Sequence, residues 1–434
     1  MDKMADVLGR AGAWCGQNKY LSAIKNAFQN FMPLTIAGAI GVLWCNVLVN
    51  DQTGLGLFFK PIMALDFLNP AFQAVNFCTI SCITVGITLG IAQEIGVWNM
   101  GAERAGYIPG LVGLAAWLSV TNTSHMVDGA KEAFTGIAGN ELGATGLFTG
   151  MIIGVLSVEL FCFFEKQDAL KIKMPEQVPP GVARAFEVLV PATITLIITA
   201  CIGSACYNLT GLYLNDVIKN GIQGPLGAVG ATIPGVMIIY LVIMLFWLVG
   251  IHGNNMLSAV KEALFTPLAL ENVEKFNKGE KPTNIINMYA LQMWGEFGGS
   301  GVTIGLVIAI MIFGKREDNK AIATLSLVPG LFNINETVTF GIPMVLNPIL
   351  GIPFVVAPLI TIIIGYVLTV IGFCPVACFS VPWTTPPIVF GFLACGANVM
   401  GAVTQAILIV VSTVIYVPFL ISYEKYQNKQ AAEA

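Results

Sequence analysis

Charged residues are scarce in this sequence. Only 11% of its 434 residues are Asp, Glu, Lys or Arg, whereas soluble domains average about 25%. Apolar residues make up 56% of the chain and the mean hydropathy is +0.78, which excludes a water-soluble globular fold. The roughly ten-residue alternating segments of a membrane β-barrel are also missing. The composition therefore predicts an all-α polytopic membrane protein.

Metal ligands are equally sparse. The chain has two His, which lie far apart in sequence, and ten Cys with no CxxC pair among them. Most of the Cys sit inside apolar segments, where a thiol usually acts as a small apolar side chain. The sequence therefore predicts no metal site and no other cofactor.

The apolar segments divide the chain into two halves. Residues 1–220 hold five apolar runs, with an amphipathic helix predicted before them and an interfacial helix after them. In residues 221–434 most apolar runs are too short, since about 20 residues are needed to cross a bilayer, or are interrupted by prolines. Short and broken runs predict re-entrant hairpins. We expect about ten crossings, a scaffold half (1–220) and a substrate-binding half (221–434). The predicted elements of the first half are 21–30 (amphipathic), 31–49, 72–92, 107–120, 142–164, 182–206 and 212–222 (interfacial).

Orientation follows from the basic residues. They gather in the N-terminal segment, after the fourth and sixth apolar runs, in 315–320 and in the C-terminal tail. Because cytoplasmic loops carry an excess of Lys and Arg, both termini are predicted to be cytoplasmic.

The segment 333–343 carries the strongest functional signal. Asn333, Asn335 and Glu336 interrupt a long apolar region, and Pro343 closes the segment. A carboxylate at bilayer depth costs roughly 2.5–3.5 kcal/mol, so it normally faces a wet cavity or a partner. Polar side chains on broken helices near the midplane are typical of transporter substrate sites. The alternative is a turn at the membrane surface in which Asn335 and Glu336 cap the next helix.

Two further constellations lie in the second half. His252, between glycines and followed by Asn254, offers the donors and acceptors that a hydroxyl-rich ligand requires. The alternative for His252 is a position favoured by the dipole of a helix end. Trp383, flanked by prolines, presents an aromatic face suited to a sugar ring, or else belongs to the interfacial aromatic belt. Glu296 is either a second polar wall or the tip of a hairpin.

Taken together, these segments resemble the enzyme IIC permeases of the bacterial phosphoenolpyruvate-dependent sugar phosphotransferase system, in the branch for lactose, cellobiose and N,N′-diacetylchitobiose. Any one of the matching segments alone would be weak, but together they are highly specific and run along nearly the whole chain. The sequence departs from the family pattern around 294–297 and at Asn255, Lys261 and Glu262, which bears on the sugar rather than the class. The matching segments are 31–38, 178–187, 250–253, 333–343, 346–348 and 381–387.

The resemblance implies ten transmembrane helices with two re-entrant hairpins, a homodimer formed through the first five helices, and elevator-like movement of the second half in the bacterial cytoplasmic membrane. Glu336 and His252 are then the catalytic residues. Glu336 binds the 6-hydroxyl that receives phosphate, His252 lies nearby, and the remaining substrate-binding residues are Asn254, Asn333, Asn335 and Trp383. The substrate is expected to be a β-linked disaccharide of the cellobiose or diacetylchitobiose type.

The partners implied are the sugar, the lipid bilayer and phosphorylated enzyme IIB, itself charged by enzyme IIA. No nucleic acid is expected. Because no soluble domain follows the last apolar run, IIA and IIB are expected as separate chains, and the permease is not an enzyme on its own. A rival interpretation is a cation-coupled secondary sugar transporter in which Glu336, Glu296 and His252 form a proton relay.

Overall fold

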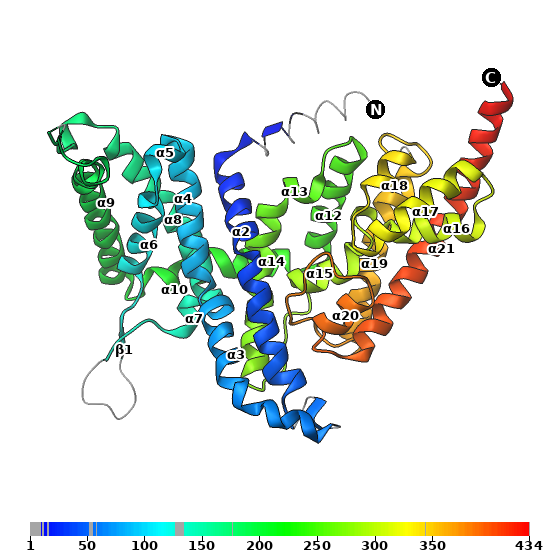
Figure 1. The fold of residues 1–434 in the computed structure, drawn as a ribbon, viewed down its shortest axis with the longest axis horizontal. Helices are drawn as coiled ribbons and strands as arrows, with labels where there is room; N and C mark the ends of the chain where they lie inside the picture. The colour runs from blue at the N-terminus through cyan, green and yellow to red at the C-terminus, as the bar shows by residue number, and fades with distance from the viewer. Residues whose placement is uncertain are drawn as a thin grey trace. The chain divides into compact units, whose positions relative to one another are not determined.

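The computed structural model describes residues 10, 13–14, 17–51, 55–57, 59–125, 134–175, 177–342 and 344–433. Pro343, the last residue of the predicted site segment, lies outside them. The chain is built from helices, drawn in Figure 1, and the described residues contain one two-stranded antiparallel ribbon, β1 (Ser124–His125) with β2 (Phe134–Thr135).

The chain divides into two compact units. Unit 2 comprises Gln17–Gly38 and Ala74–Gly227, and unit 1 groups Ala39–Gln73 with Ala228–Ala434. Three helices have residues in both units: α2 (Lys19–Leu43), α3 (Asn69–Asn76) and α11 (Gly224–Gly230). Hydropathy alone predicts a division near residue 220, whereas the contacts also group 39–73 with the second half. The division into scaffold and substrate halves by role remains a prediction.

Unit 2 is a helical bundle. Helices α4, α6, α8 and α9 pack side by side (Figure 1), around a core in which Ala116, Trp117, Val120 and Ile153 are buried. Helix α9 begins at Pro180, which lacks the N–H that a first turn leaves unused, and ends at Gly211 with φ +72°. The helices that lie wholly in unit 2 are α4 (Ile83–Met100), α5 (Ala102–Ala105), α6 (Ile108–Val120), α7 (Gly139–Leu142), α8 (Ala144–Glu165), α9 (Pro180–Thr210) and α10 (Leu214–Ile218).

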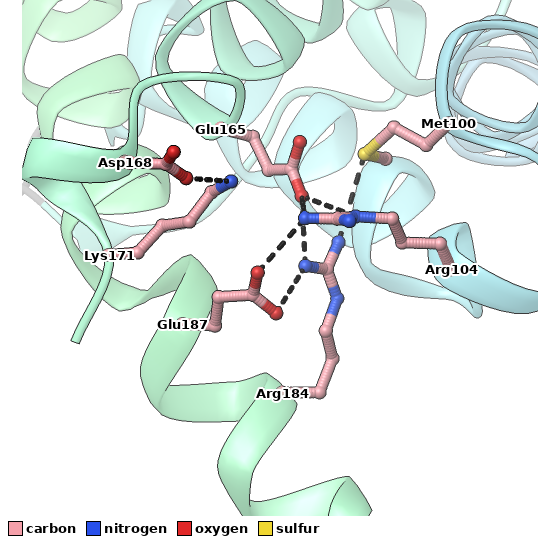
Figure 2. Close-up of polar contacts among 7 residues, drawn as sticks. All are labelled: Met100, Arg104, Glu165, Asp168, Lys171, Arg184 and Glu187. Carbon is pink, nitrogen blue, oxygen red and sulfur yellow. Dashed lines mark hydrogen bonds and ion pairs between the residues drawn. The ribbon is translucent and has the colours of Figure 1, made fainter. Parts of the chain in front are cut away.

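A cluster of ion pairs joins helix ends in unit 2 (Figure 2). Glu165, whose side chain is 3% exposed, accepts hydrogen bonds from Arg104 and Arg184 at 2.9 Å each, and both arginines also pair with Glu187 at 2.9 Å. A buried carboxylate is tolerated where it is paired in this way. The family-like segment 178–187 therefore supplies structural contacts. The neighbouring Lys171 hydrogen-bonds Asp168 and lowers the pKa of that carboxyl, which lies in the exposed loop after α8.

Unit 1 contains the elements that hold the predicted site. Helices α16, α17 and α21 lie side by side (Figure 1), and α19 packs on α12, α15 and α21. The elements are α12 (Ile233–Leu248), α13 (Gly253–Met256), α14 (Ser258–Asn277), α15 (Met288–Gly295), the 3₁₀ turn η7 (Ser300–Val302), α16 (Ile304–Phe313), α17 (Glu317–Leu331), α18 (Glu336–Gly341), α19 (Gly351–Val370), α20 (Val389–Ala394) and α21 (Val399–Glu433).

Several apolar helices are long enough to cross a membrane. Among the described residues five qualify by length and composition, and seven if each of two bent pairs counts as one span. One bent pair, Met288–Val302 with Ile304–Phe313, turns by 58° at its break, and the apolar α6 and α12 are shorter. The all-α polytopic class is thus confirmed, while the count of ten crossings and two hairpins stays a prediction. The qualifying helices are Lys19–Leu48, Ala144–Glu165, Pro180–Thr210, Gly351–Val370 and Val399–Glu433.

One local prediction is corrected and one is confirmed. The amphipathic helix expected at 21–30 is not separate, because α2 runs unbroken from Lys19 to Leu43. The apolar run 398–420, expected as the last span, lies almost wholly in α21, and this helix continues to Glu433. The proline-rich segment 381–387 is non-helical as predicted.

Candidate functional site

His252 lies in the turn between α12 and α13. Its Nδ1 accepts a hydrogen bond from the backbone N–H of Asn255 at 3.3 Å, which caps α13, and its ring lies 4.4 Å from the ring of Trp247. Because Nδ1 is an acceptor, the proton of the neutral imidazole is on Nε2. No described residue hydrogen-bonds Nε2. His252 therefore offers one oriented donor to a ligand.

Asn254 links this turn to two other elements. Its Nδ2 donates to Ser300 Oγ at 3.1 Å, and its Oδ1 accepts from Lys261 Nζ at 3.2 Å. Lys261 also forms an ion pair with Glu296, whose Oε1 accepts the hydroxyl of Tyr240 at 2.7 Å. The side chain of Asn254 is thus committed to protein contacts that position α13 against the break between α15 and α16.

That break is built by glycines. Gly298, Gly299 and Gly301 all have positive φ, a region that other residues rarely adopt. A Cβ on Gly299 would lie 2.5 Å from Asn335 Cγ, and one on Gly301 would lie 2.3 Å from the ring of Phe354. The glycines therefore allow the loop to approach the 333–336 segment closely.

Asn333 and Asn335 hold this loop. Asn333, with φ +62°, accepts from Gly298 N at 2.6 Å and donates from Nδ2 to the carbonyls of Trp383 (2.5 Å) and Thr385 (3.0 Å). Asn335 is 4% exposed and donates to the carbonyl of Ser300 at 2.7 Å. Both amides act on backbone atoms of distant loops, so in the present geometry they position the site.

Glu336 begins α18 immediately after these asparagines, and its side chain is exposed. Its charge acts on the His252 imidazole, as do the charges of Glu296 and Lys261. The alternative interpretation, a turn at the membrane surface, predicts that Asn335 caps α18. The side chain of Asn335 makes no such capping hydrogen bond. Glu336 is therefore positioned through the chain by Asn335, which directly precedes it and bonds to Ser300.

Trp383 lies in the non-helical segment before α20. The residue is 47% exposed, and its carbonyl accepts a hydrogen bond from Asn333. An exposed aromatic face with a fixed backbone is suited to stacking on the apolar face of a sugar ring.

The structure thus brings Asn254, Asn333 and Asn335 into one hydrogen-bonded frame, with His252, Glu336 and Trp383 attached to it. Lys261, Tyr240 and Ser300 also belong to this frame, although they are not among the predicted site residues. Lys261 could have been found from the sequence, because its charge departs from the family pattern. The sequence gives no comparable sign that Tyr240 or Ser300 belongs to the site.

Apolar helices long enough to cross a membrane, with a polar frame at the break between α15 and α16, define a polytopic helical membrane protein. Residues 25–358 match the family model described as Phosphotransferase system, EIIC. The chain is 32% identical over 98% of its length to the oligo-beta-mannoside-specific EIIC component of Bacillus subtilis (94% of that protein). It is 30% identical over 98% of its length to the cellobiose-specific EIIC component of Lactococcus lactis (98% of that protein).

Among solved structures, the chain is similar to the transporter ChbC, the IIC component of the N,N'-diacetylchitobiose-specific phosphotransferase system. The TM-score is 0.88 with 29% sequence identity, and the match covers 97% of each chain. This chain belongs to the EIIC family of phosphotransferase-system sugar permeases.

Proposed function

We propose that this chain carries a β-linked disaccharide across the cytoplasmic membrane and presents the sugar's 6-hydroxyl to phosphorylated enzyme IIB. The observation that carries the proposal is the similarity to the diacetylchitobiose transporter over 97% of both chains. Oligo-β-mannosides, cellobiose and diacetylchitobiose, named for its relatives, all have β-linkages.

In this proposal Glu336 accepts the 6-hydroxyl proton and His252 Nε2 donates to the sugar or to the incoming phosphoryl group. A carboxylate is an acceptor that can also act as a general base on a hydroxyl. The balance of the transfer is simple: the phosphoryl group leaves the IIB cysteine sulfur for the sugar oxygen, and the hydroxyl proton is released. Trp383 stacks on a sugar ring, and Asn254, Asn333 and Asn335 hold the loops that present these groups.

The wider organisation belongs to the same proposal. Residues 1–220 form the scaffold and the homodimer contact, residues 221–434 move the sugar by an elevator-like displacement, and both termini are cytoplasmic. The phosphoryl donor is a separate protein.

The test is transport in membrane vesicles supplied with phosphoenolpyruvate and the soluble phosphotransferase proteins, including IIA and IIB. Sugar phosphate should accumulate inside, and an uncoupler should not prevent it. Free sugar inside and loss of uptake with an uncoupler would establish the cation-coupled transporter instead.

Glu336→Gln provides the matched variant. We expect it to fold, to bind sugar more weakly and to lose phosphorylation, because the amide cannot take the hydroxyl proton. Glu317→Gln is the control, since the Glu317 side chain is 87% exposed and pairs with Lys320 at 3.2 Å. Unchanged sugar affinity and turnover in Glu336→Gln would remove Glu336 from the site.

A further inference from the structure

Glu296 is a second carboxylate of the polar frame, and the reaction described above does not use it. It follows the last residue of α15, at the glycine break, and its charge acts on the His252 imidazole together with that of Glu336. We propose that Glu296 binds hydroxyls of the disaccharide and selects a sugar with free neighbouring hydroxyls over one with an acetamido group. This inference rests on the proposed sugar site.

The two carboxylate oxygens of Glu296 have different surroundings. Oε1 accepts from Tyr240 Oη at 2.7 Å and from Lys261 Nζ. Oε2 accepts from no residue that the structure describes, and the side chain keeps 19% exposure. One oxygen therefore anchors the carboxylate, and the other is left for a ligand.

Lys261 holds the carboxylate of Glu296 in place. It is 5% exposed, and its Nζ lies 5.5 Å from the ring centre of Tyr240, which is itself 1% exposed. Because the buried Lys261 and Tyr240 both bond to Oε1, they fix the direction in which Oε2 of Glu296 points.

The frame connects Glu296 to the phosphorylation end. Lys261 donates to Asn254, Asn254 donates to Ser300, and the Ser300 carbonyl accepts from Asn335, which precedes Glu336. Glu296 and the segment that carries Glu336 are therefore tied to one hydrogen-bonded frame.

The hydrogen-bonding chemistry of a carboxylate sets the selectivity. It only accepts hydrogen bonds, so it favours donors, and charge-assisted hydrogen bonds are the stronger ones. Two neighbouring hydroxyls offer two donors. In a 2-acetamido sugar one of these hydroxyls is replaced by an amide N–H, which is still a donor but cannot rotate out of the amide plane. The acetyl group attached to it is bulkier than a hydroxyl and adds a carbonyl oxygen, an acceptor that a carboxylate repels. The inferred substrate class is an unsubstituted β-linked hexose disaccharide such as cellobiose.

The experiment measures the dissociation constants of cellobiose and N,N′-diacetylchitobiose for the purified full chain in detergent. Wild type should prefer cellobiose. Glu296→Gln should weaken cellobiose binding about 10-fold or more, through loss of charge-assisted hydrogen bonds, and change diacetylchitobiose binding less than about 2-fold. Glu317→Gln should leave both constants unchanged.

Tyr240→Phe is a second variant that keeps the carboxylate and removes one anchor. It should weaken cellobiose binding selectively but by less than Glu296→Gln, which keeps the test decisive if the latter does not fold. A wild-type preference for diacetylchitobiose, equal losses for both sugars or no loss in either variant would overturn the inference. Sugar phosphate formation by the wild type is scored separately, and its absence would instead overturn the proposed function.

Discussion

At the scale of single residues, the sequence predicted which polar groups matter better than it predicted what they do. His252, Glu336 and Trp383 were identifiable because polar or proline-bracketed residues are unusual in an apolar chain. Asn333 and Asn335 were predicted as sugar contacts, yet their amides bond to backbone atoms 35 or more positions away. Such partners are set by tertiary packing, which no local pattern reports.

His252 allows binding and transfer to be separated. We expect His252→Ala to reduce sugar phosphate formation at saturating sugar by about 100-fold, the lower end of what a positioned proton donor or acceptor contributes. Sugar affinity should fall much less, because Nε2 makes one hydrogen bond among several. Phosphorylation kinetics and binding measured on one preparation check this.

The control is His125→Ala, which removes the other histidine of the chain and lies in unit 2. Both activities should be unchanged in it. Equal losses of binding and transfer in His252→Ala would indicate that the imidazole only binds the sugar.

At the scale of elements, the predicted non-helical segment 381–387 was found, whereas the separate helix predicted at 21–30 was not. The prolines of 381–387 exclude a regular helix whatever packs around them. In contrast, the amphipathic pattern at 21–30 contains no helix-stopping residue, so α2 passes through it. The break after α15 falls at the glycine run 298–301, and its 58° bend packs closely against the ring of Phe354 and the side chain of Asn335, which lie far off in the sequence.

Gly301→Ala tests that break. Gly301 has φ +80°, and an added Cβ would lie 2.3 Å from the Phe354 ring, so both backbone strain and overpacking apply. We expect a loss of roughly 2–4 kcal/mol in the free energy of unfolding, measured by denaturation in detergent.

The matched control for this substitution is Gly372→Ala. Gly372 has φ +79° but nothing within 4 Å of the added Cβ, so only the backbone strain of about 1–2 kcal/mol applies. Equal losses in the two variants would show that close packing at the break contributes nothing to stability.

At the scale of the whole molecule, composition and a few motifs were enough for the class and the family. Composition and motifs did not predict which segments of the chain group into each of the two compact units. Residues 39–73 group with 228–434 through contacts between segments far apart in sequence, and hydropathy contains no information on such contacts.

Ligand-dependent stability tests the protein as a whole. A sugar that binds only the folded state stabilises it by about 2.7 kcal/mol at a concentration 100 times its Kd. We expect cellobiose to raise the unfolding temperature of the detergent-solubilised chain and the α-linked isomer maltose to leave it unchanged. Glu336→Gln should require more cellobiose for the same rise. A rise of the same size with maltose would contradict a site for β-linked sugars.

The side chain of Asn333 has a consequence for how such permeases diversify. It bonds to the backbone N–H of Gly298 and to the carbonyls of Trp383 and Thr385. Every amino acid supplies a backbone carbonyl, so the side chains at positions 383 and 385 can be exchanged while their bonds to Asn333 are kept. Bonds made to the main chain in this way let new carbohydrate preferences arise by exchange of the displayed side chains, while the bonds themselves stay unchanged.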